Sequence, residues 1–395
     1  MSKWEKVKLG EICDLDNGYA FKSSDYISNS NTINCRMSNI RPNATFDALY
    51  NAKYLPDNYS VKYSNYLLRD GDVIIAMTDM ANDPKILGVP TVVETQGYNM
   101  LLNQRVGRLR FLKEVDGAYL KYALCQPQAR SHFKRFAGGG LQINVGKKEI
   151  LSVEIPLPPV ETQKQIAKTL DTAAELLALR KQQLAELDNL IKSQFIEMFG
   201  DPVTNSLGWD TDLLEKYANV LTGHPFDSSK YSENGIKICG GLIIMPDRIA
   251  WEDAKYWSSS LGLEKYLLEE NDIVLAMDRP WISSGFKIGQ ISRYDLPTLL
   301  IQRTARIRAK NMNQSFMNWM ISSQRFLMHC NITETTVPHI SIKDIKSFEI
   351  LVPPLELQNQ FAEIVTKINE QKALVKKAIY ETQYLFDSLM SEYCE

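Results

Sequence analysis

The sequence has little of what usually marks a metal site, a disulfide framework or a membrane segment. It contains four histidines, none paired four residues apart, and six scattered cysteines without a CxxC pair. A metal site and a set of disulfides are therefore not expected. No apolar stretch approaches the roughly 18 residues of a membrane-spanning helix, and the segment after Met1 lacks the apolar core of a signal peptide. We expect a protein without membrane contact in a reducing cytoplasm.

Catalytic motifs are equally scarce. There is no GxxxxGK[ST] loop, no GxGxxG turn, no GxSxG elbow and no Asn/Asp-Pro-Pro-aromatic string of the kind that amino-methyltransferases use. One string, Asp247 followed by Asp253 and Lys255, resembles the acid–acid–lysine arrangement of some nucleases. Its spacing is very short, and Asn51 stands at the position of Asp253 in an earlier copy of this segment. Solvated surface charge is the favoured interpretation, so we predict no catalytic residues, no metal and no cofactor on this chain.

What the sequence does contain is a duplication. Trp4 and Gly18 return as Trp209 and Gly223 at one constant offset. Three later blocks return in the same order, namely 66–77 as 266–277, 104–110 as 302–308, and 152–163 as 347–358. Collinear repeats indicate two copies of one module, and a chain of 395 residues is long enough for both.

Each module is predicted to be of mixed α and β structure, in the α/β class. Runs rich in Val, Ile and Leu beside turn residues predict strands, at 72–77, 105–111, 272–277 and 305–308. Short helices are expected at 117–126, 147–151 and 315–324. Each module then ends in a proline pair, Pro158-Pro159 or Pro353-Pro354, which predicts a sharp exit from strand into helix.

Two long helices are predicted to follow these prolines. Residues 160–199 contain no Pro or Gly, and apolar residues recur there every seven positions, the mark of a coiled coil of about 60 Å. A second, less regular stripe crosses 355–393 and includes Leu385. The predicted seam residues are Leu170, Leu177, Leu184, Ile191, Ile368, Val375 and Leu389. Because a long amphipathic helix cannot cover its own stripe, we expect the two to pair antiparallel, with the modules at opposite ends.

Charge and loop composition favour binding over catalysis. The net charge is −2, the first module being mildly basic and the second near neutral, so this is not a strongly basic nucleic-acid binder. Two repeated segments nevertheless concentrate Arg and Gln, which can contact guanine and adenine bidentately. A solvated strand face is the alternative for these arginines. The candidate DNA contacts are Lys22, Ser23, Ser24, Thr78, Gln104, Arg105, Arg108, Lys134, Arg135, Gly139 and Gln142 in the first module, and Ser228, Ser229, Lys230, Asp278, Arg279, Gln302, Arg303, Arg306 and His339 in the second.

The loops of the two modules differ where the strands match. Thr78 follows the first Val-Ile-Ile strand, whereas Asp278 and Arg279 follow its repeat. The first module has a cationic, glycine-rich loop near Lys134, and the second has His339 without glycines there. Similar strands with different loops are what we expect of two modules that recognise two different DNA sequences.

The doubled set of motifs resembles the specificity subunit of type I restriction–modification enzymes. The likeness rests on the opening around Trp4, the Gly18-x2-Phe21 segment and the exit from Pro158 to Gln163, and it covers essentially the whole chain. It implies that each target recognition domain reads half of a bipartite double-stranded DNA site, with the paired helices as a ruler for the gap. The implied division is target recognition domain 1 at 1–157, a central coiled-coil helix at 158–200, target recognition domain 2 at 201–352 and a C-terminal coiled-coil helix at 353–395.

The same resemblance implies partners. Modification subunits would carry S-adenosylmethionine and the adenine N6 methylation, and restriction subunits would carry the ATP- and Mg-dependent translocation and cleavage. Three alternatives stay open on the residues alone: a free-standing two-headed DNA-binding regulator, a nuclease using Asp247 and Asp253, and a coiled-coil scaffold.

Overall fold

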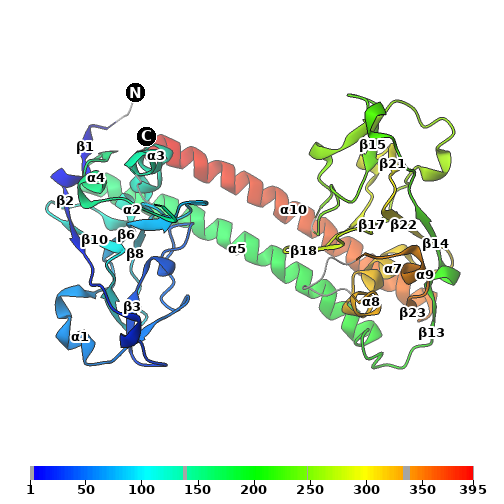
Figure 1. The fold of residues 1–395 in the computed structure, drawn as a ribbon, viewed down its shortest axis with the longest axis horizontal. Coiled ribbons are helices and arrows are strands. Elements are labelled where there is room, and N and C mark those ends of the chain that lie inside the picture. The colour runs from blue at the N-terminus through cyan, green and yellow to red at the C-terminus, as the bar shows by residue number, and fades with distance from the viewer. Residues whose placement is uncertain (1–3, 137–139, 247, 332–338, 395) are drawn as a thin grey trace. The chain divides into compact units, whose positions relative to one another are not determined.

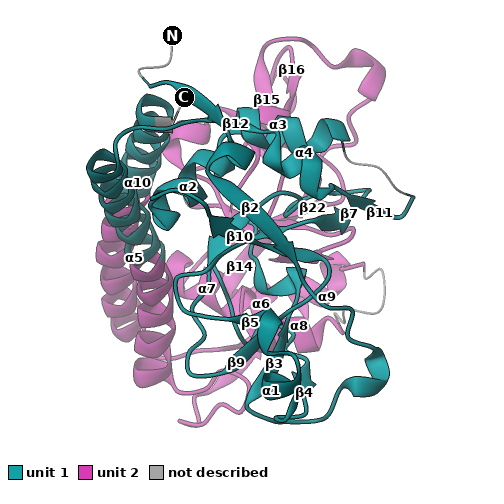
Figure 2. Ribbon diagram, turned by 90° about the vertical axis from the view of Figure 1, so that its left-hand side faces the viewer, with its two compact units in different colours: residues 1–181, 377–395 teal, residues 182–376 magenta. Residues whose placement is uncertain are grey.

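The computed structural model describes residues 4–136, 140–246, 248–331 and 339–394. The chain forms two compact units (Figure 2). Unit 1 comprises residues 1–181 and 377–395, and unit 2 comprises residues 182–376. The boundaries between the units fall within the two long helices, so each unit contains its own module and a part of each helix.

Unit 1 is built on a four-stranded antiparallel sheet. Its strands, in spatial order, are β2 (Cys13–Asn17), β10 (Val106–Phe111), β6 (Val73–Ala76) and β8 (Pro90–Val92). Every residue of β6 is buried, because side chains alternate between two faces and both faces are covered. Val73 and Ile75 contribute to a core shared with the helices, and Ile74 and Ala76 contribute to a second core shared with another sheet.

The remaining elements of unit 1 surround this sheet (Figure 1). The second sheet has the order β4 (Tyr54–Leu55), β3 (Thr32–Cys35), β9 (Asn99–Leu102) and β5 (Leu67–Leu68), with β3 and β9 parallel. Two strand pairs are β1 (Lys6–Lys8) with β12 (Glu154–Pro156), and β7 (Thr78–Met80) with β11 (Gln142–Asn144). The short helices are α1 (Tyr59–Lys62), α2 (Gly117–Cys125), α3 (Pro127–Phe136) and α4 (Lys147–Leu151). Side chains of α2, α3 and α4 pack with the long helices in the first core.

Unit 2 repeats this architecture. Its main sheet has the order β14 (Ala218–Thr222), β22 (Thr304–Ala309), β17 (Ile273–Ala276) and β20 (Ile288–Gln290), which is the order of the unit 1 sheet. The other strands are β16 (Lys255–Trp257), β15 (Ile236–Cys239) and β21 (Thr298–Leu300) in one sheet, and the pairs β13 (Thr211–Leu213) with β23 (Glu349–Leu351) and β18 (Trp281–Ile282) with β19 (Gly285–Phe286). The short helices are α6 (Leu214–Tyr217), α7 (Gln314–Ile321), α8 (Gln324–His329) and α9 (Ile342–Lys346).

The predicted mixed α and β fold is confirmed, and most predicted elements differ from the observed ones by a residue or two. One correction concerns function. Gln104 and Arg105 were expected to belong to a strand, but they form a turn before β10, and both side chains are exposed. Asn103 causes this break, because its side-chain oxygen accepts the Arg105 N–H at 3.2 Å and its carbonyl accepts the Val106 N–H. The prediction of a helix at 315–324 was also too long, since α7 ends at Ile321 and α8 begins at Gln324.

A buried glutamine stabilises each connection from the proline pair into the long helix. Gln163 is 1% exposed, its Oε1 accepts the Asp116 N–H at 2.9 Å and its Nε2 donates to the Pro158 carbonyl at 2.8 Å. Asp116 is the N-cap of α2, so the amide joins the start of a long helix to the start of a short one. Buried amides require such partners.

Unit 2 contains the same device. Gln358 is 2% exposed, accepts the N–H of Asn313, the N-cap of α7, at 2.9 Å and donates to the Pro353 carbonyl at 2.7 Å. The repeated Pro-Pro-x-Glu-x-Gln motif therefore encodes a structural joint, a role that the sequence pattern did not indicate.

The two long helices are α5 (Val160–Phe199) and α10 (Leu355–Cys394). In unit 2, Asp188 of α5 pairs with Lys372 of α10, and further along α5 the Phe195 ring lies 5.4 Å from the ring of Phe361, earlier on α10. The contact that lies later on α5 lies earlier on α10, so the two helices pair antiparallel, as predicted. In unit 1, Arg180 donates to Thr382 and to the Ala378 carbonyl, so this break in the apolar stripe is a polar contact between the helices.

Most of the predicted seam is buried. Leu170, Leu177, Ile191, Ile368 and Val375 are buried, and Leu184 and Leu389 are partly buried. The inclusion of Leu385 in the second stripe was wrong. Its side chain is 51% exposed, whereas Thr382 is 3% exposed and Phe386 packs against the core. The buried row of α10 continues at seven-residue spacing through Val375, Thr382 and Leu389, so a polar threonine takes the place in the row where the apolar pattern offered no residue.

The glutamine joint generates a stability prediction. Gln163→Ala leaves the Asp116 N–H and the buried Pro158 carbonyl without partners, which is expected to lower the free energy of unfolding by about 2–4 kcal/mol. Chemical denaturation followed by circular dichroism measures this loss. Gln165 is exposed on the same helix, and Gln165→Ala is expected to change stability by less than about 0.5 kcal/mol. Equal losses in the two variants would contradict a structural role for Gln163.

Candidate nucleic-acid interface

Three segments of unit 1 meet at the end of the main sheet where β6 finishes. The Met77 N–H donates to the Arg105 carbonyl at 3.0 Å, and the Val145 N–H donates to the Met77 carbonyl at 2.9 Å. β7 pairs with β11 in the same place, with Gln142 opposite Met80. We name this meeting point the loop edge of unit 1 and define it by residues 77–80, 104–105 and 142–145.

The loop edge brings four predicted contact residues together. Gln104 and Arg105 are exposed at the turn, and Gln142 is partly buried on β11. Thr78 is 3% exposed, and its hydroxyl donates to the Asn144 side-chain oxygen at 2.7 Å. Thr78 therefore positions Asn144, an exposed residue at the end of β11.

Unit 2 forms a loop edge with the same backbone bonds. The Met277 N–H donates to the Arg303 carbonyl at 3.0 Å, and the Ile340 N–H donates to the Met277 carbonyl at 2.9 Å. Asp278 and His339 form an antiparallel bridge where β7 and β11 pair in unit 1. We define this loop edge by residues 277–279, 302–303 and 339–340, and five predicted contacts lie in it: Asp278, Arg279, Gln302, Arg303 and His339.

The side chains at the two loop edges differ in chemistry. Asp278 Oδ1 lies 2.6 Å from His339 Nδ1, and Asp278 Oδ2 lies 2.9 Å from Arg303 Nη1. The Arg303 side chain is 74% exposed, so its other N–H groups face solvent. Unit 1 thus offers mainly amides beside Arg105, and unit 2 offers an arginine and a histidine held by a carboxylate.

Asp278 is ionised more readily than a free aspartate. Partial burial opposes its ionisation, but hydrogen bonds from His339 and Arg303 outweigh this effect and hold the pKa of Asp278 below its usual value. A carboxylate that is fixed in this way orients both donors before any ligand arrives.

The backbone of Tyr19 or His224 adjoins each loop edge, and the sequence reading selected neither residue. The Gln104 N–H donates to the Tyr19 carbonyl at 3.0 Å, and the Gln302 N–H donates to the His224 carbonyl at 2.9 Å. Each of the two follows a glycine, and a Cβ at Gly18 or Gly223 would meet backbone atoms at 2.3 Å. A sequence signal for these two residues exists. A glycine is repeated in both modules, and the residue after it differs although the rest of the block matches.

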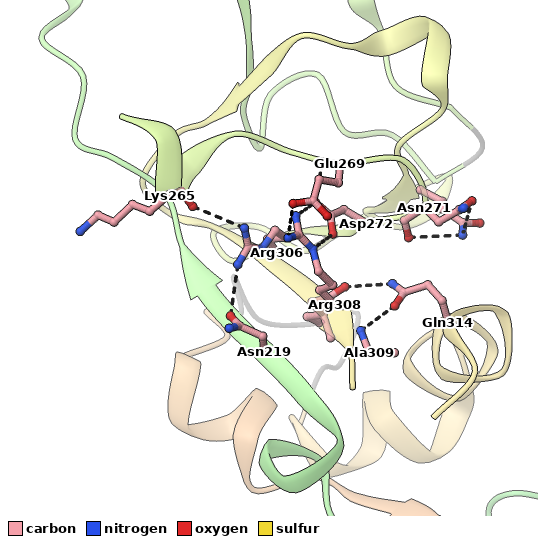
Figure 3. A network of polar contacts seen from close by, with 11 residues as sticks. Asn219, Lys265, Glu269, Asn271, Asp272, Arg306, Arg308, Ala309 and Gln314 are labelled. Carbon is pink, nitrogen blue, oxygen red and sulfur yellow. Dashed lines mark hydrogen bonds and ion pairs between the residues drawn. The ribbon is translucent and has the colours of Figure 1, made fainter. Parts of the chain in front are cut away.

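Arg108 and Arg306 lie away from the loop edges, inside polar networks. Arg108 contacts Asp16 at 3.0 Å and Asp72 at 3.8 Å. Arg306 is 7% exposed and donates to the Asn219 side chain at 3.1 Å (Figure 3). Neighbouring segments supply these partners, so Arg108 and Arg306 do not lie on a freely solvated strand face, and their contact with DNA stays a prediction.

The remaining predicted contacts are exposed but separate from the loop edges in sequence. Lys22, Ser23 and Ser24 form a single turn, in which the Lys22 N–H donates to Asp25 at 2.8 Å. Ser228, Ser229 and Lys230 form the equivalent turn, capped by Asp227. Lys134 and Arg135 are exposed near the end of α3, and Gly139 lies outside the described residues.

The nuclease-like string gains no support. Asp247 lies outside the described residues, and Asp253 is exposed in a single turn that ends at that residue. Among the described residues, no group of three or more His, Cys, Asp or Glu side chains is arranged to hold a metal ion. Across the same described residues, no helix is both long enough and apolar enough to cross a membrane.

Comparison with known proteins supplies the family context. A family model described as "Type I restriction modification DNA specificity domain" matches residues 1–189 and 253–382. The type I restriction enzyme MjaVIII specificity subunit of Methanocaldococcus jannaschii is 28% identical over 285 residues, covering 67% of this chain and 66% of that protein. The type I restriction enzyme EcoAI specificity subunit of Escherichia coli is 25% identical over 334 residues, covering 80% of this chain and 55% of that protein. The matched regions therefore span about two thirds and about half of the lengths of these relatives.

Two solved structures share the fold. The S subunit of a type I restriction–modification system from M. genitalium aligns with a TM-score of 0.62 at 15% identity, covering 99% of this chain and 96% of that one. A chain from a study of complex assembly and conformational transition of the type I R-M system aligns with a TM-score of 0.55 at 17% identity, covering 99% of this chain and 97% of that one.

The Asp278 contacts generate a pH prediction. Because its folded-state pKa is depressed, its contribution to stability is present above its unfolded pKa of about 3.9 and is lost as pH falls through the folded value. Asp278→Asn is expected to be less stable than the parent at pH 7 by about 0.2–1 kcal/mol, the range for exposed pairs. This difference is expected to shrink as pH falls below about 4, as measured by denaturant unfolding at each pH.

Asp253→Asn is the matched control, because Asp253 is exposed and has no ion pair among the described residues. No pH-dependent difference is expected for it. A difference for Asp278→Asn that persists unchanged at low pH would contradict the ion-pair account.

Proposed function

The chain belongs to the type I restriction–modification DNA specificity family, and from that membership we propose that it selects the DNA sequence on which a larger restriction–modification enzyme acts. In this role the chain binds double-stranded DNA and carries out no bond-making or bond-breaking step. Adenine methylation with S-adenosylmethionine, and ATP- and Mg-dependent translocation and cleavage, belong to separate modification and restriction subunits in this proposal.

The observation that carries the proposal is the pair of loop edges. Both are assembled by the same backbone hydrogen bonds at Met77 and Met277, yet one carries Thr78 and Asn144 and the other carries Asp278 and His339. A shared scaffold with different exposed donors and acceptors is suited to direct readout of two different base sequences. Each unit then reads one half of a bipartite target.

The proposed base contacts come from the loop edges, and the proposed phosphate contacts come from the exposed turns. Arginine pairs bidentately with guanine, and Asn or Gln pairs with adenine. The proposed base contacts are Gln104, Arg105, Gln142, Asn144, Arg279, Gln302, Arg303 and His339. Hydroxyl, amine and guanidinium groups commonly contact phosphates, and the proposed phosphate contacts are Lys22, Ser23, Ser24, Lys134, Arg135, Ser228, Ser229 and Lys230.

The proposed domain boundaries lie close to the proline pairs. Residues 1–157 and 201–352 form the two target recognition domains, and residues 158–200 and 353–395 form the helices that set the gap in the target. The helices also bind the modification subunits in this proposal. In unit 1 they expose five large apolar side chains, a feature typical of surfaces that a partner covers: Leu176, Leu179, Tyr380, Tyr384 and Leu385.

The charge of the chain leads to a binding prediction. With a net charge of −2, the isolated chain supplies only part of the phosphate attraction that DNA binding requires. We expect it to bind duplex DNA weakly, with a steep loss of affinity between 50 and 200 mM salt, and to bind more tightly when the modification subunit is added. Fluorescence anisotropy of a labelled duplex measures both effects. Nanomolar, sequence-specific binding that the modification subunit leaves unchanged would instead favour a free-standing regulator.

A second prediction concerns Arg303. If its exposed guanidinium reads a base, Arg303→Ala is expected to weaken specific binding by about 1–3 kcal/mol and to relax the sequence requirement at one position of one half-site. Mapping of N6-methyladenine in cells that carry the complete system measures the change. Arg293 of unit 2 is also exposed, and within the described part of the chain its side chain contacts Tyr294, so Arg293→Ala is expected to leave the methylated sequence unchanged. An unchanged sequence in Arg303→Ala would remove this residue from the base contacts.

A further inference from the structure

Arg306 of unit 2 lacks the directly opposite carboxylate that its counterpart in unit 1, Arg108, has. Arg108 in unit 1 lies opposite Asp16 on the neighbouring strand and pairs with it at 3.0 Å. Arg306 occupies the same place in unit 2, but the residue opposite it is Leu221. The repeat of Asp72 is Asp272, and Arg308 occupies both of its oxygens at 2.6 and 2.7 Å.

Arg306 therefore has only neutral partners. Its Nη2 donates to the Asn219 side chain at 3.1 Å and its Nη1 to the Lys265 carbonyl at 3.4 Å. Its Nε is buried without a hydrogen-bond partner. Within the described residues, no carboxylate lies at ion-pair distance from this guanidinium, although Asp272 and Glu269, which pair with Arg308, are near enough to attract it.

Burial makes the missing carboxylate costly. Arg306 is 7% exposed, and burial together with repulsion from Arg308 lowers the pKa of its guanidinium more than attraction to Asp272 and Glu269 raises it. An arginine nevertheless stays protonated in a protein, and a buried charge without a carboxylate in direct contact is destabilising. A counter-ion from outside the unit would remove this penalty.

A cleft provides the place for such a counter-ion. A depression of about 580 Å³ lies beside Arg306, and its walls include Asn219, Leu221 and Lys265. Two glutamates also line it, but both already have partners. Glu264 accepts the Gly262 N–H at 2.9 Å, and Glu269 pairs with Arg308 at 2.6 Å.

The cleft thus holds three cations, Lys265, Arg306 and Arg308, against two carboxylates, Glu264 and Glu269. Lys265 has no ion pair among the described residues, and its ammonium lies over the Tyr266 ring at 4.7 Å from the centroid. Together with Arg306 and the amide of Asn219, it can supply donors to a tetrahedral oxyanion.

The position of the cleft indicates which oxyanion. Arg306 lies three residues beyond Arg303, on the strand that leaves the loop edge of unit 2. Arg303 precedes β22, so three residues of chain span at most about 10 Å, which is about the rise of three base pairs of duplex. β14, which carries Asn219 and Leu221, is an edge strand of its sheet, so a ligand can approach from that side.

We propose that the cleft beside Arg306 binds a backbone phosphate of DNA, at a distance of about three base pairs from the base contacts of Arg303. This inference rests on the proposed function, since it takes DNA as the ligand. Unit 1 has no such site because Asp16 already neutralises Arg108. The two units thus differ in how they hold the DNA backbone as well as in which bases they contact.

The test restores the carboxylate that unit 1 has. Leu221→Asp places an acid opposite Arg306, which closes the site without removing the arginine. Leu261 is exposed in a loop of unit 2, and Leu261→Asp adds the same charge elsewhere as a matched control. Chemical denaturation of both variants checks that they fold, and Leu221→Asp is expected to be at least as stable as the parent.

The first readout uses inorganic phosphate with the free chain, titrated against chloride at constant ionic strength and followed by isothermal titration calorimetry. Leu221→Asp is expected to lose affinity for phosphate by about tenfold or more, whereas Leu261→Asp is expected to keep it. Equal phosphate affinity in the parent and Leu221→Asp would overturn the site.

The second readout uses DNA with the chain bound to its modification subunit. Leu221→Asp is expected to reduce the slope of log affinity against log salt by about 1 relative to Leu261→Asp, and to leave the methylated sequence unchanged. Loss of phosphate binding without any change in this slope would overturn DNA as the ligand and leave an acidic side chain of a partner subunit as the occupant. Failure of the parent complex to bind DNA would refute the proposed function. The phosphate titration would still decide independently whether the cleft binds an oxyanion.

Discussion

Two buried glutamines fix how each module continues into its long helix, and the rest of the structure follows from that joint. Gln163 and Gln358 each accept the N–H of the N-cap residue of a short helix and donate to the carbonyl of a proline at the exit. Proline restricts the backbone before the helix, and the amide restricts it after the helix has begun. The apolar stripes of α5 and α10 then enter the cores of the modules, where Ile166 and Phe361 are buried. The repeated motif at the exits is conserved between the two copies because it performs this task in both.

The duplication separates what the fold needs from what recognition needs. The main sheets have the same strand order, and the backbone bonds at Met77 and Met277 are the same. The side chains at the loop edges and the partners of Arg108 and Arg306 are different. A repeat in which the scaffold is shared and the exposed polar groups are not is expected of a protein that performs one kind of recognition on two different sequences.

Local patterns predicted the elements well, and tertiary contacts account for what they missed. The helix expected at 147–151 coincides with α4, and the long helix expected from 160 to 199 coincides with α5, because proline, glycine and periodicity are local signals. The partners of Arg108 could not be predicted, since Asp16 lies far away in sequence and only strand pairing brings it near. The same reason explains Thr78, which looked like a contact and is buried against Asn144. Leu385 was misassigned because the buried position in that part of α10 is held by Thr382, a polar residue that a search for apolar periodicity passes over.

The central claim is that each unit reads its own half of the target. The most direct measurement is a map of N6-methyladenine in cells that carry the complete system, made with the parent chain and with a chain whose residues 1–157 come from another member of the family. The account predicts that one half of the methylated sequence changes while the other half and the gap between them stay the same. A change in both halves, or in neither, would contradict it.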